Sequence, residues 1–326
     1  MRIGVYSPNW IGDSVIAIPF IQSLKDQEPD AEIVIICKDW VAGVYDNHPA
    51  VDKIIPFSKI QLTGLINIIR IGLDLKEYDF DIFYTLTDSF RSALILWLSN
   101  AQRRYGYSTQ MRSMFLTDVV PISNKIIHRS KKYLNLIQSD SKNLDVPIIH
   151  LTNSENTWAE KEMEKLGLSK PVALFPFSVA NNRTIPNKVL INWIRKSNND
   201  YLVFGSENDI ERGERLINVC GGISIRSICG EYPLRESIAL ISACKYALAT
   251  DSGLGHISAA LGLPTISFFG IGIDAETAPA GENTTIIKHC SPCMGDLCKD
   301  HDENRSCIQE ISRSDIEVAV NRITNQ

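Results

Sequence analysis

The sequence predicts an α/β protein made of two successive doubly wound parallel-sheet domains. Short apolar segments typical of buried strands alternate with helical patterns, and this alternation begins again near Val172. A chain of 326 residues is long for one domain and suits two of about 150 residues each. We therefore assign residues 1–155 and 156–326 to two Rossmann-like domains, with the last helix a candidate to pack back on the first.

In the first half, an apolar strand pattern is followed by a loop over 7–13 and a helical pattern that runs to about Gln27. Pro19 lies inside this helical pattern, and an interior proline costs about 3 kcal/mol. We therefore expect a kink or a restart of the helix there. Strands are expected at 3–6, 32–37, 53–56 and 79–86, and a helix at 128–138.

The second half repeats this scheme and includes one continuous β-turn-α-β unit over residues 246–270. In that unit we expect a strand ending near Ala249, a tight turn over 250–255, a helix starting near His256 and a strand over 265–269. The other expected elements are strands at 172–175 and 201–204, and helices at 155–166, at 190–195, at 234–243 and up to Cys220.

Composition describes an ordinary globular protein, with 44% hydrophobic and 22% charged residues. The net charge of −5 argues against general nucleic-acid binding. No apolar stretch approaches the roughly 18 residues that a membrane helix needs, and the first residues lack a cleavable apolar region, so we expect an unexported protein.

Residues 89–132 carry a local basic field with a single acid, Asp118. This field suggests an anionic partner. Its basic residues are Arg91, Arg103, Arg104, Arg112, Lys125, Arg129, Lys131 and Lys132.

The first candidate site is the segment Asn9-Trp10-Ile11-Gly12-Asp13, at the carboxyl end of the first expected strand. Gly12 permits close approach of the backbone to a ligand, and Asp13 opens a helix. Asp13 is either a helix-capping or first-turn acid, as most acids in such places are, or a general base that faces the crevice between the domains. Sequence spacing leaves both interpretations open.

The second candidate site is the segment from Asp251 to His256. Backbone N–H groups at the start of a helix favour an anion such as a phosphate, and Gly253 and Gly255 remove side chains there. The helix end also favours a neutral His256 ring, which can donate a hydrogen bond to a phosphate or a sugar. An ordinary capped crossover with a packed histidine is the alternative.

The third candidate site is the loop over 177–186, which follows the first strand of the second domain. Its hydroxyl groups and single cation suit contact with a phosphate, and a solvated loop is the alternative. The residues are Ser178, Arg183 and Thr184, with Lys188 just beyond.

The eight cysteines fall into two groups. Those scattered through apparent core elements are interpreted as buried thiols in a reducing compartment: Cys37, Cys220, Cys229 and Cys244. The other four lie close together, and three interpretations stay open for them, namely reduced thiols, a zinc site or labile disulfides: Cys290, Cys293, Cys298 and Cys307. Reduced thiols are slightly favoured.

Four motifs in this order resemble glycosyltransferase family 9, the ADP-heptose:lipopolysaccharide heptosyltransferases, over nearly the whole chain. The resemblance is strongest to the branch that adds the second inner-core heptose, the heptosyltransferase II branch. The motifs are NWIGD at 9–13, SFRSAL at 89–94 with RRYGY at 103–107, ATDSGLGHISAALGLPTISFFG at 249–270, and CSPC at 290–293 with Cys298 and Cys307.

The resemblance implies the GT-B fold, with two Rossmann-like domains facing across a cleft, and an inverting displacement that needs no metal cofactor. Asp13 would deprotonate the acceptor. Acceptor contacts would come from Asn9, Trp10, Gly12, Arg91, Arg103 and Arg104 in the N-terminal domain. Contacts to the phosphates of the donor, ADP-heptose, would come from Ser178, Arg183, Thr184, Lys188, Asp251, Ser252, Gly253, Leu254, Gly255 and His256 in the C-terminal domain.

The expected partners are therefore a nucleotide sugar and the anionic lipid A–core, without nucleic acid. The expected location is the cytoplasm, with peripheral contact to the inner membrane. The chain departs from the family at Arg183, where lysine is usual, and arginine binds phosphate with a different geometry. A family member with another nucleotide sugar or acceptor, and a non-catalytic nucleotide-sugar-binding protein, are the competing functions.

Overall fold

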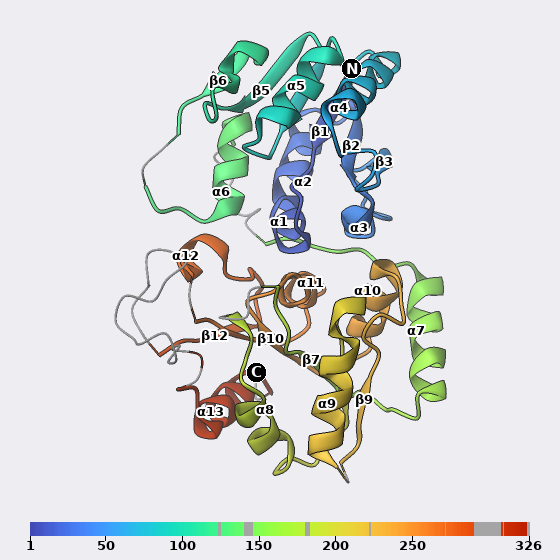
Figure 1. Ribbon diagram of the computed structural model, residues 1–326, viewed down its shortest axis with the longest axis vertical. Helices are drawn as coiled ribbons and strands as arrows, with labels where there is room; N and C mark the ends of the chain where they lie inside the picture. Colours follow the sequence, from blue (N-terminus) through green and yellow to red (C-terminus); the bar gives the residue numbers. More distant parts are fainter. Residues whose placement is uncertain are drawn as a thin grey trace. The chain divides into compact units, whose positions relative to one another are not determined.

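The computed structural model describes residues 1–122, 125–139, 146–179, 183–221, 223–270, 272–289, 308 and 310–324. The chain forms two compact units, Met1–His150 and Leu151–Gln326. Each unit contains a six-stranded sheet in which every strand pair is parallel (Figure 1). The predicted pair of doubly wound parallel-sheet units is confirmed.

The sheet of the first unit has the strand order β3-β2-β1-β4-β5-β6. The middle residues of its central strands are apolar and buried, as expected for a parallel sheet that is covered on both faces. Ile3 of β1 pairs with Ile33 of β2 and Ile82 of β4. The strands are β1 (Arg2–Tyr6), β2 (Glu32–Lys38), β3 (Lys53–Phe57), β4 (Ile82–Thr85), β5 (Arg103–Tyr107) and β6 (Asp118–Val120).

The helices of the first unit confirm the expected effect of Pro19. One helix ends at Ile16, and the next begins at Ile18 with the proline in its first turn, where a missing N–H costs nothing. Gly72 of α4 packs closely on α5, since a Cβ atom at Gly72 would lie 2.5 Å from Cβ of Leu98. The helices are α1 (Ile11–Ile16), α2 (Ile18–Gln27), α3 (Asp39–Ala42), α4 (Leu65–Asp74), η1 (Leu75–Tyr78), α5 (Phe90–Leu98), η2 (Arg112–Phe115), α6 (Arg129–Leu134) and η3 (Asn135–Ile137).

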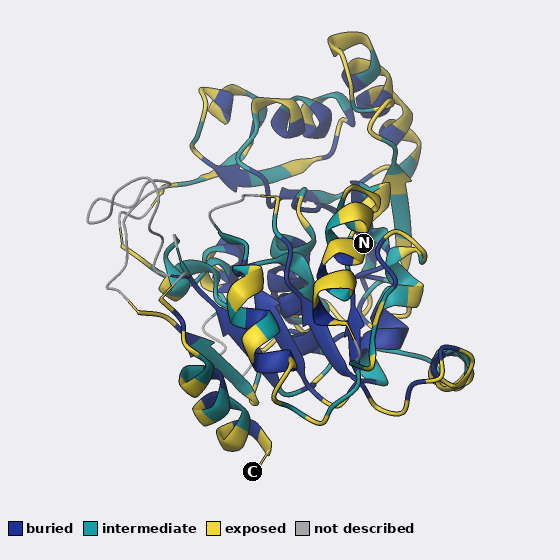
Figure 2. Cartoon of the chain, turned by 60° about the horizontal axis from the view of Figure 1, so that its bottom comes forward, coloured by how far each residue is buried: buried dark blue, intermediate teal, exposed yellow. Residues whose placement is uncertain are grey.

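The sheet of the second unit has the order β12-β11-β10-β7-β8-β9. Strands β7, β8, β10 and β11 are buried at every residue and appear dark blue in Figure 2, as expected for strands covered on both faces. The strands are β7 (Val172–Phe175), β8 (Tyr201–Val203), β9 (Ile225–Ser227), β10 (Ala247–Thr250), β11 (Thr265–Phe268) and β12 (Thr284–Ile287).

Helices α8, α9 and α13 of the second unit contribute to an apolar core formed with its strands. The last helix, α13, contributes Ile316, Ala319 and Ile323 to that core and packs against β12, β11 and α8. The helices are α7 (Asn153–Lys165), α8 (Asn187–Ile194), η5 (Glu207–Asp209), α9 (Ile210–Cys220), α10 (Leu234–Ser242), α11 (Gly253–Ala260), α12 (Asp274–Thr277) and α13 (Arg313–Thr324). In the described part of the chain, no helix has the length and apolar character that crossing a membrane requires.

The structure corrects the expected start of α11. We expected a turn over 250–255 and a helix from about His256, but the helix begins at Gly253. Gly255 is therefore a helical residue whose Cα faces the strand, since a Cβ atom there would lie 3.0 Å from Cβ of Ala249. Its role is close packing of the helix on β10.

The four scattered cysteines are buried, as predicted. Burial, with a further contribution from nearby acids, raises the pKa of Cys37 to about 12, and burial also raises the pKa of Cys220, Cys229 and Cys244. These thiols are therefore poor nucleophiles near neutral pH.

Glu155 joins α7 to α10 and is expected to make stability sensitive to acid. It accepts hydrogen bonds from Arg235 Nε at 2.5 Å and from the Thr152 N–H at 2.7 Å, which closes a capping box. The bond from Arg235, followed by those from Thr152, lowers the pKa of Glu155 from 4.5 to about 2. Because the folded-state pKa is depressed, this stabilisation is full above pH 4.5 and is lost as pH falls toward about 2.

We expect Glu155→Gln to lower the free energy of unfolding at pH 7 and to flatten its decline below pH 4.5. Chemical denaturation of both proteins along a pH series measures this difference. Glu160→Gln, on the exposed side of the same helix, is the matched control. Equal acid dependence in the wild type and Glu155→Gln would contradict the assignment.

Candidate functional site

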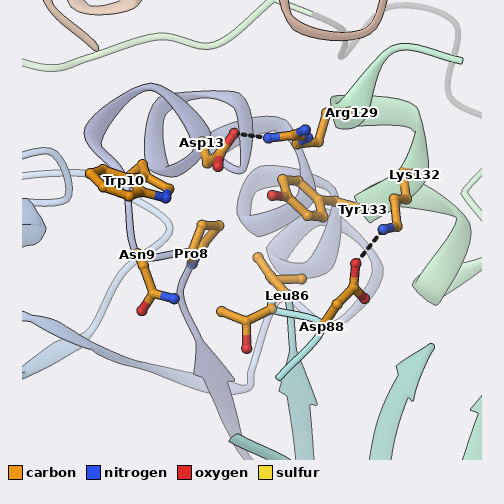
Figure 3. A pocket seen from close by; sticks show the side chains of 10 residues that line it. Pro8, Asn9, Trp10, Asp13, Leu86, Asp88, Arg129, Lys132 and Tyr133 are labelled. Atoms are coloured by element: carbon orange, nitrogen blue, oxygen red, sulfur yellow. Dashed lines mark hydrogen bonds and ion pairs between the residues drawn. The ribbon is translucent and has the colours of Figure 1, made fainter. Parts of the chain in front are cut away.

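A cavity of about 230 Å³ lies where β1 and β4 of the first unit end (Figure 3). The loops that follow parallel strands meet at the carboxyl edge of a sheet, which is where open α/β sheets bind ligands. Helix α6 supplies a third side of the cavity. The cavity is lined by Pro8, Asn9, Trp10 and Asp13 after β1, by Leu86, Thr87 and Asp88 after β4, and by Arg129, Lys132 and Tyr133 of α6.

Asp13 lies in the first turn of α1, and its carboxylate lines the cavity. No side chain caps this helix. The Asp13 carboxylate in its first turn interacts favourably with the positive end of the helix. Its Oδ1 forms an ion pair with Nη1 of Arg129, which points toward it from α6 (Figure 3). The carboxylate is only partly buried, with 19% of the side chain exposed. It is therefore oriented by Arg129 and still accessible from the cavity.

A second acid, Asp88, lies at the opposite side of the cavity and is held by two cations. Lys132 Nζ is 2.7 Å from its Oδ2, and Nη2 of the fully buried Arg112 is 3.3 Å from its Oδ1. Arg112 also donates to the carbonyl groups of Thr87 and Tyr107, the latter at 2.9 Å. Arg112 thereby fixes the loop after β4, and Asp88 positions Lys132 at the cavity wall.

Two tyrosines close the inner side of this arrangement. Tyr133 lines the cavity but is buried, and burial raises its pKa well above the usual value. Tyr107 donates from its hydroxyl to the Lys132 carbonyl at 2.5 Å. Burial, and then the Asp88 carboxylate, raise the pKa of Tyr107 to about 12. Both rings are therefore neutral near physiological pH, and the charges at the cavity are those of the acids and the basic residues.

The structure places the residues predicted to contact the acceptor in different surroundings. Asn9 and Trp10 line the cavity, and Trp10 is exposed. Arg91 is exposed near the start of α5. Arg103 and Arg104 lie on β5, where Arg103 forms an ion pair with Asp118 at 2.8 Å and Arg104 donates to backbone carbonyl groups. Gly12 is the second residue of α1.

The basic residues of the segment 89–132 have different surroundings in the structure. Arg112 is fully buried, Arg103 is paired with an acid, and Arg129 and Lys132 line the cavity. Arg129 and Lys132 were expected only as members of this basic segment and were not predicted as residues of the first candidate site. Their spacing of three residues on a helix, which places side chains on one face, is the signal that could have identified them.

In the second unit, Asp251 follows β10 and is 7% exposed. Nη1 of Arg183, from the loop after β7, is 3.1 Å from its Oδ2. Two of the predicted donor-binding segments therefore meet at the carboxyl ends of β7 and β10, which are adjacent strands. This ion pair combines a buried carboxylate with a partly exposed guanidinium group.

The other predicted residues of this loop hold its shape. The Ser178 N–H donates to Thr184 Oγ1 at 3.2 Å, and Ser178 Oγ lies 3.5 Å from the Asp251 carbonyl oxygen. Arg212 of α9, which the sequence analysis missed, donates to Thr184 Oγ1 at 3.2 Å and stacks 4.5 Å from the centre of the Phe177 ring. Lys188 is exposed in the first turn of α8.

Helix α11 begins beside this ion pair. Ser252 is its N-cap residue, and its buried hydroxyl has no hydrogen-bond partner among the described residues. Gly253 and Leu254 follow in the first turn and are partly exposed, whereas His256 is buried. The start of the helix thus combines backbone N–H groups, a hydroxyl group and the nearby Arg183, which together suit an anion.

Metal binding was considered for the cysteine cluster, and Cys290, Cys293, Cys298 and Cys307 lie outside the described residues. Within the described ranges, no group of three or more His, Cys, Asp and Glu side chains is placed to hold a metal ion.

Comparison with known proteins identifies relatives along most of the chain. A sequence profile of glycosyltransferase family 9 (heptosyltransferase) matches residues 68–304. Lipopolysaccharide heptosyltransferase 2 of Salmonella typhimurium is 25% identical over 318 residues, 88% of each chain. The structure of Escherichia coli ADP-heptose lps heptosyltransferase II superposes with a TM-score of 0.84 at 22% identity and covers 100% of this chain and 99% of that one. A glycosyl transferase family 9 structure from Veillonella parvula gives 0.86 at 18% identity, with 99% and 96% covered. These structures share the two-unit GT-B fold.

Proposed function

This chain belongs to glycosyltransferase family 9, the heptosyltransferase family, and on that premise we propose that it transfers L-glycero-D-manno-heptose from ADP-heptose to the inner core of lipopolysaccharide. The observation that carries the choice of substrates is the match to lipopolysaccharide heptosyltransferase 2 over 88% of both chains. A family member of this kind is an enzyme that forms a glycosidic bond. The roles proposed below for individual residues rest on the family resemblance, and the geometry of the site supports them.

Asp13 is proposed as the general base. An acceptor hydroxyl bound in the cavity gives its proton to the Asp13 carboxylate as its oxygen attacks the anomeric carbon of the donor. The new C–O bond forms as the bond between that carbon and the diphosphate oxygen breaks, and ADP leaves with the electron pair. A carboxylate held at the cavity surface by Arg129 suits this role, because proton transfer needs a base in a fixed direction within hydrogen-bond reach.

The cations around the cavity are proposed to bind the anionic groups of the acceptor. Arg129 and Lys132 each contact an acid at the cavity, so both can turn part of their hydrogen-bonding capacity toward a phosphate or carboxylate. Asn9, Trp10 and Gly12 would position the sugar ring, and Arg91, Arg103 and Arg104 would contact more distant charges. Arg103 is held by its ion pair with Asp118 and Arg104 by its hydrogen bonds to carbonyl groups, so these two are the weaker members of the set.

The donor phosphates are proposed to bind in the second unit at the start of α11. Negative charge develops on the diphosphate as the glycosidic bond breaks, and free N–H groups at a helix start stabilise such charge without a metal ion. Arg183 and Lys188 would add positive charge, and Ser178, Thr184 and Ser252 would supply hydroxyl groups. Asp251 holds Arg183 in place. Gly253, Leu254, Gly255 and His256 form the helical turn that carries the N–H groups.

The donor and the acceptor together suggest where the reaction takes place. Nucleotide sugars are cytoplasmic metabolites, and the proposed acceptor is anchored by its lipid in a membrane. We therefore place the enzyme in the cytoplasm with peripheral contact to the inner membrane.

The purified protein should transfer heptose from ADP-heptose to lipopolysaccharide truncated after the first inner-core heptose, detected as a mass increase of one heptose residue. A panel of other nucleotide sugars, tested with the same acceptor, serves as the control for donor identity. Turnover with another nucleotide sugar and none with ADP-heptose would refute the proposed donor. Turnover with ADP-heptose only on a different glycan would refute the proposed acceptor.

A further inference from the structure

Helix α4 of the first unit is apolar on two sides. Its inner side, with Ile68 and Ile71, packs into the core of the unit. Its outer side carries Leu65, Ile66, Ile69 and Leu73, of which Leu65 is 64% and Ile66 76% exposed. A soluble helix normally exposes its polar residues and buries its apolar ones, so the four exposed apolar side chains of α4 form a surface that no described residue of this unit covers.

The neighbouring elements extend this apolar surface. Helix α5 lies against α4 and also packs against η2 (Figure 1). On α5, the exposed rings of Phe90 and Trp97 lie seven residues apart on one side of the helix, and their centres are 5.1 Å and 5.7 Å from that of Phe115 in η2. Aliphatic side chains with an aromatic pair are the residues that enter the boundary between lipid headgroups and acyl chains.

A short turn beside η2 presents one more apolar side chain. Gln110 and Met111 both have left-handed backbones, with φ of 46° and 55°, which is unfavourable for residues other than glycine. Met111 is 89% exposed, so no burial offsets this cost. The turn is tied to the cavity, since the Phe90 N–H donates to Gln110 Oε1 at 3.1 Å and Thr109 Oγ1 donates to the Asp88 carbonyl at 3.0 Å. The apolar surface therefore reaches the rim of the proposed acceptor cavity.

Basic residues flank the same surface. Lys59 precedes α4, Arg70 lies on its exposed side, and Arg91 lies in the first turn of α5. None of these three side chains forms an ion pair or hydrogen bond with another residue in the described ranges. Asp74 is the exposed acid on α4. Cations around exposed aliphatic and aromatic side chains complement an anionic membrane surface.

We propose that the outer side of α4, together with Phe90, Trp97 and Met111, docks the first unit on an anionic lipid surface. This deepens the proposed function and rests on it for its purpose, because an acceptor anchored by its lipid must present its sugar at the membrane surface. The docking surface and the acceptor cavity belong to the same unit, so binding to the membrane would bring the cavity to the acceptor.

The first experiment measures binding to vesicles without donor or lipopolysaccharide. Flotation with phosphatidylcholine vesicles that contain about 30 mol% phosphatidylglycerol should recover the wild type, and vesicles of phosphatidylcholine alone should recover much less. Ile66→Glu should lower the partition coefficient about tenfold or more, and Arg70→Gln about fivefold. Val318→Glu, at a similarly exposed position on α13, is the matched control and should bind like the wild type.

A loss of binding by Val318→Glu equal to that of Ile66→Glu would overturn the proposal, as would wild-type binding that Ile66→Glu leaves unchanged. Light scattering tests whether a second copy of the chain covers this surface instead. If the wild type is a dimer that does not bind vesicles, and Ile66→Glu is a monomer, the surface is a dimer interface and the membrane proposal is overturned. Circular dichroism of each variant checks the fold.

A second assay separates this proposal from the proposed function. Ile66→Glu should transfer heptose to a deacylated, soluble acceptor at the wild-type rate and to the same acceptor anchored in vesicles several-fold more slowly. If the proposed function fails, neither transfer assay shows product, and vesicle binding still tests the docking surface. If the docking proposal fails, both transfer rates stay at the wild-type level.

Discussion

Asp13→Asn should lower kcat for heptose transfer by about 10²- to 10⁴-fold, the usual contribution of a general base. The amide keeps the shape of the side chain and removes its capacity to accept the acceptor proton. The donor is proposed to bind in the second unit, so its dissociation constant should stay within about twofold of the wild-type value. Steady-state transfer kinetics measure kcat. Calorimetric titration with ADP, the nucleotide part of the donor, measures binding at the donor site.

Asp26→Asn is the matched control for this substitution. Asp26 is an exposed acid on α2 that accepts a hydrogen bond from Gln22 at 3.0 Å and does not line the cavity. It should transfer heptose at the wild-type rate. Asp13→Asn also frees Arg129 from its ion pair, so Arg129→Gln is measured alongside it. Full kcat in Asp13→Asn would exclude Asp13 as the base, whatever Arg129→Gln shows.

Arg183→Ala should weaken donor binding by about 100-fold, with a smaller effect on the affinity for the acceptor. Two effects add in the same direction. The substitution removes a cation proposed to contact the diphosphate, and it leaves the buried Asp251 carboxylate without the guanidinium group 3.1 Å away. Removing the partner of a buried charge lowers the stability of the fold by several kcal/mol. The negative charge of Asp251 also repels the phosphates.

Asp251→Asn in the Arg183→Ala background distinguishes these two effects. It removes the negative charge at residue 251, so the double variant should recover part of the lost donor affinity but not all of it. Arg183→Lys keeps the positive charge, introduces the lysine that is usual in the family at this place and should bind the donor within about tenfold of the wild type. Arg215→Ala, on the exposed surface of α9, is the control. Unchanged ADP affinity in Arg183→Ala would remove this residue from the donor site.

The sequence predicted the frame of both units because strand patterns and stop signals act locally. Apolar segments such as β7 and the interior of β2 are typical of strands covered on both faces, and Pro19 marked the restart between α1 and α2. Strands with few buried residues were missed. Strands β6 and β9 lie at the edges of their sheets and are only partly buried, so they lack the apolar pattern that identified β8, which also has three residues. Strand β5 carries two arginines that resembled a charged surface.

The candidate residues that follow strands could also be predicted from the sequence. Ligand sites in open α/β sheets lie at the carboxyl ends of strands, so Asn9, Trp10 and Asp13 after β1, and Asp251 after β10, could be selected before their neighbours were known. Their chemical roles could not, because a first-turn acid and a general base have the same local sequence. The comparison confirms the family resemblance, and that resemblance is the ground on which Asp13 is proposed as the base.

By itself, then, the sequence determined the two parallel-sheet units, the loops that carry the acids and the family. Only the tertiary structure decided which charges meet. Arg129 reaches Asp13 across 116 residues of chain and Lys132 reaches Asp88 across 44, and Arg112, a surface residue by composition, is fully buried. Pairings of this kind depend on where the strands end in space and on which carboxylate or carbonyl group compensates a buried charge. The spacing of residues along the chain does not determine either of these.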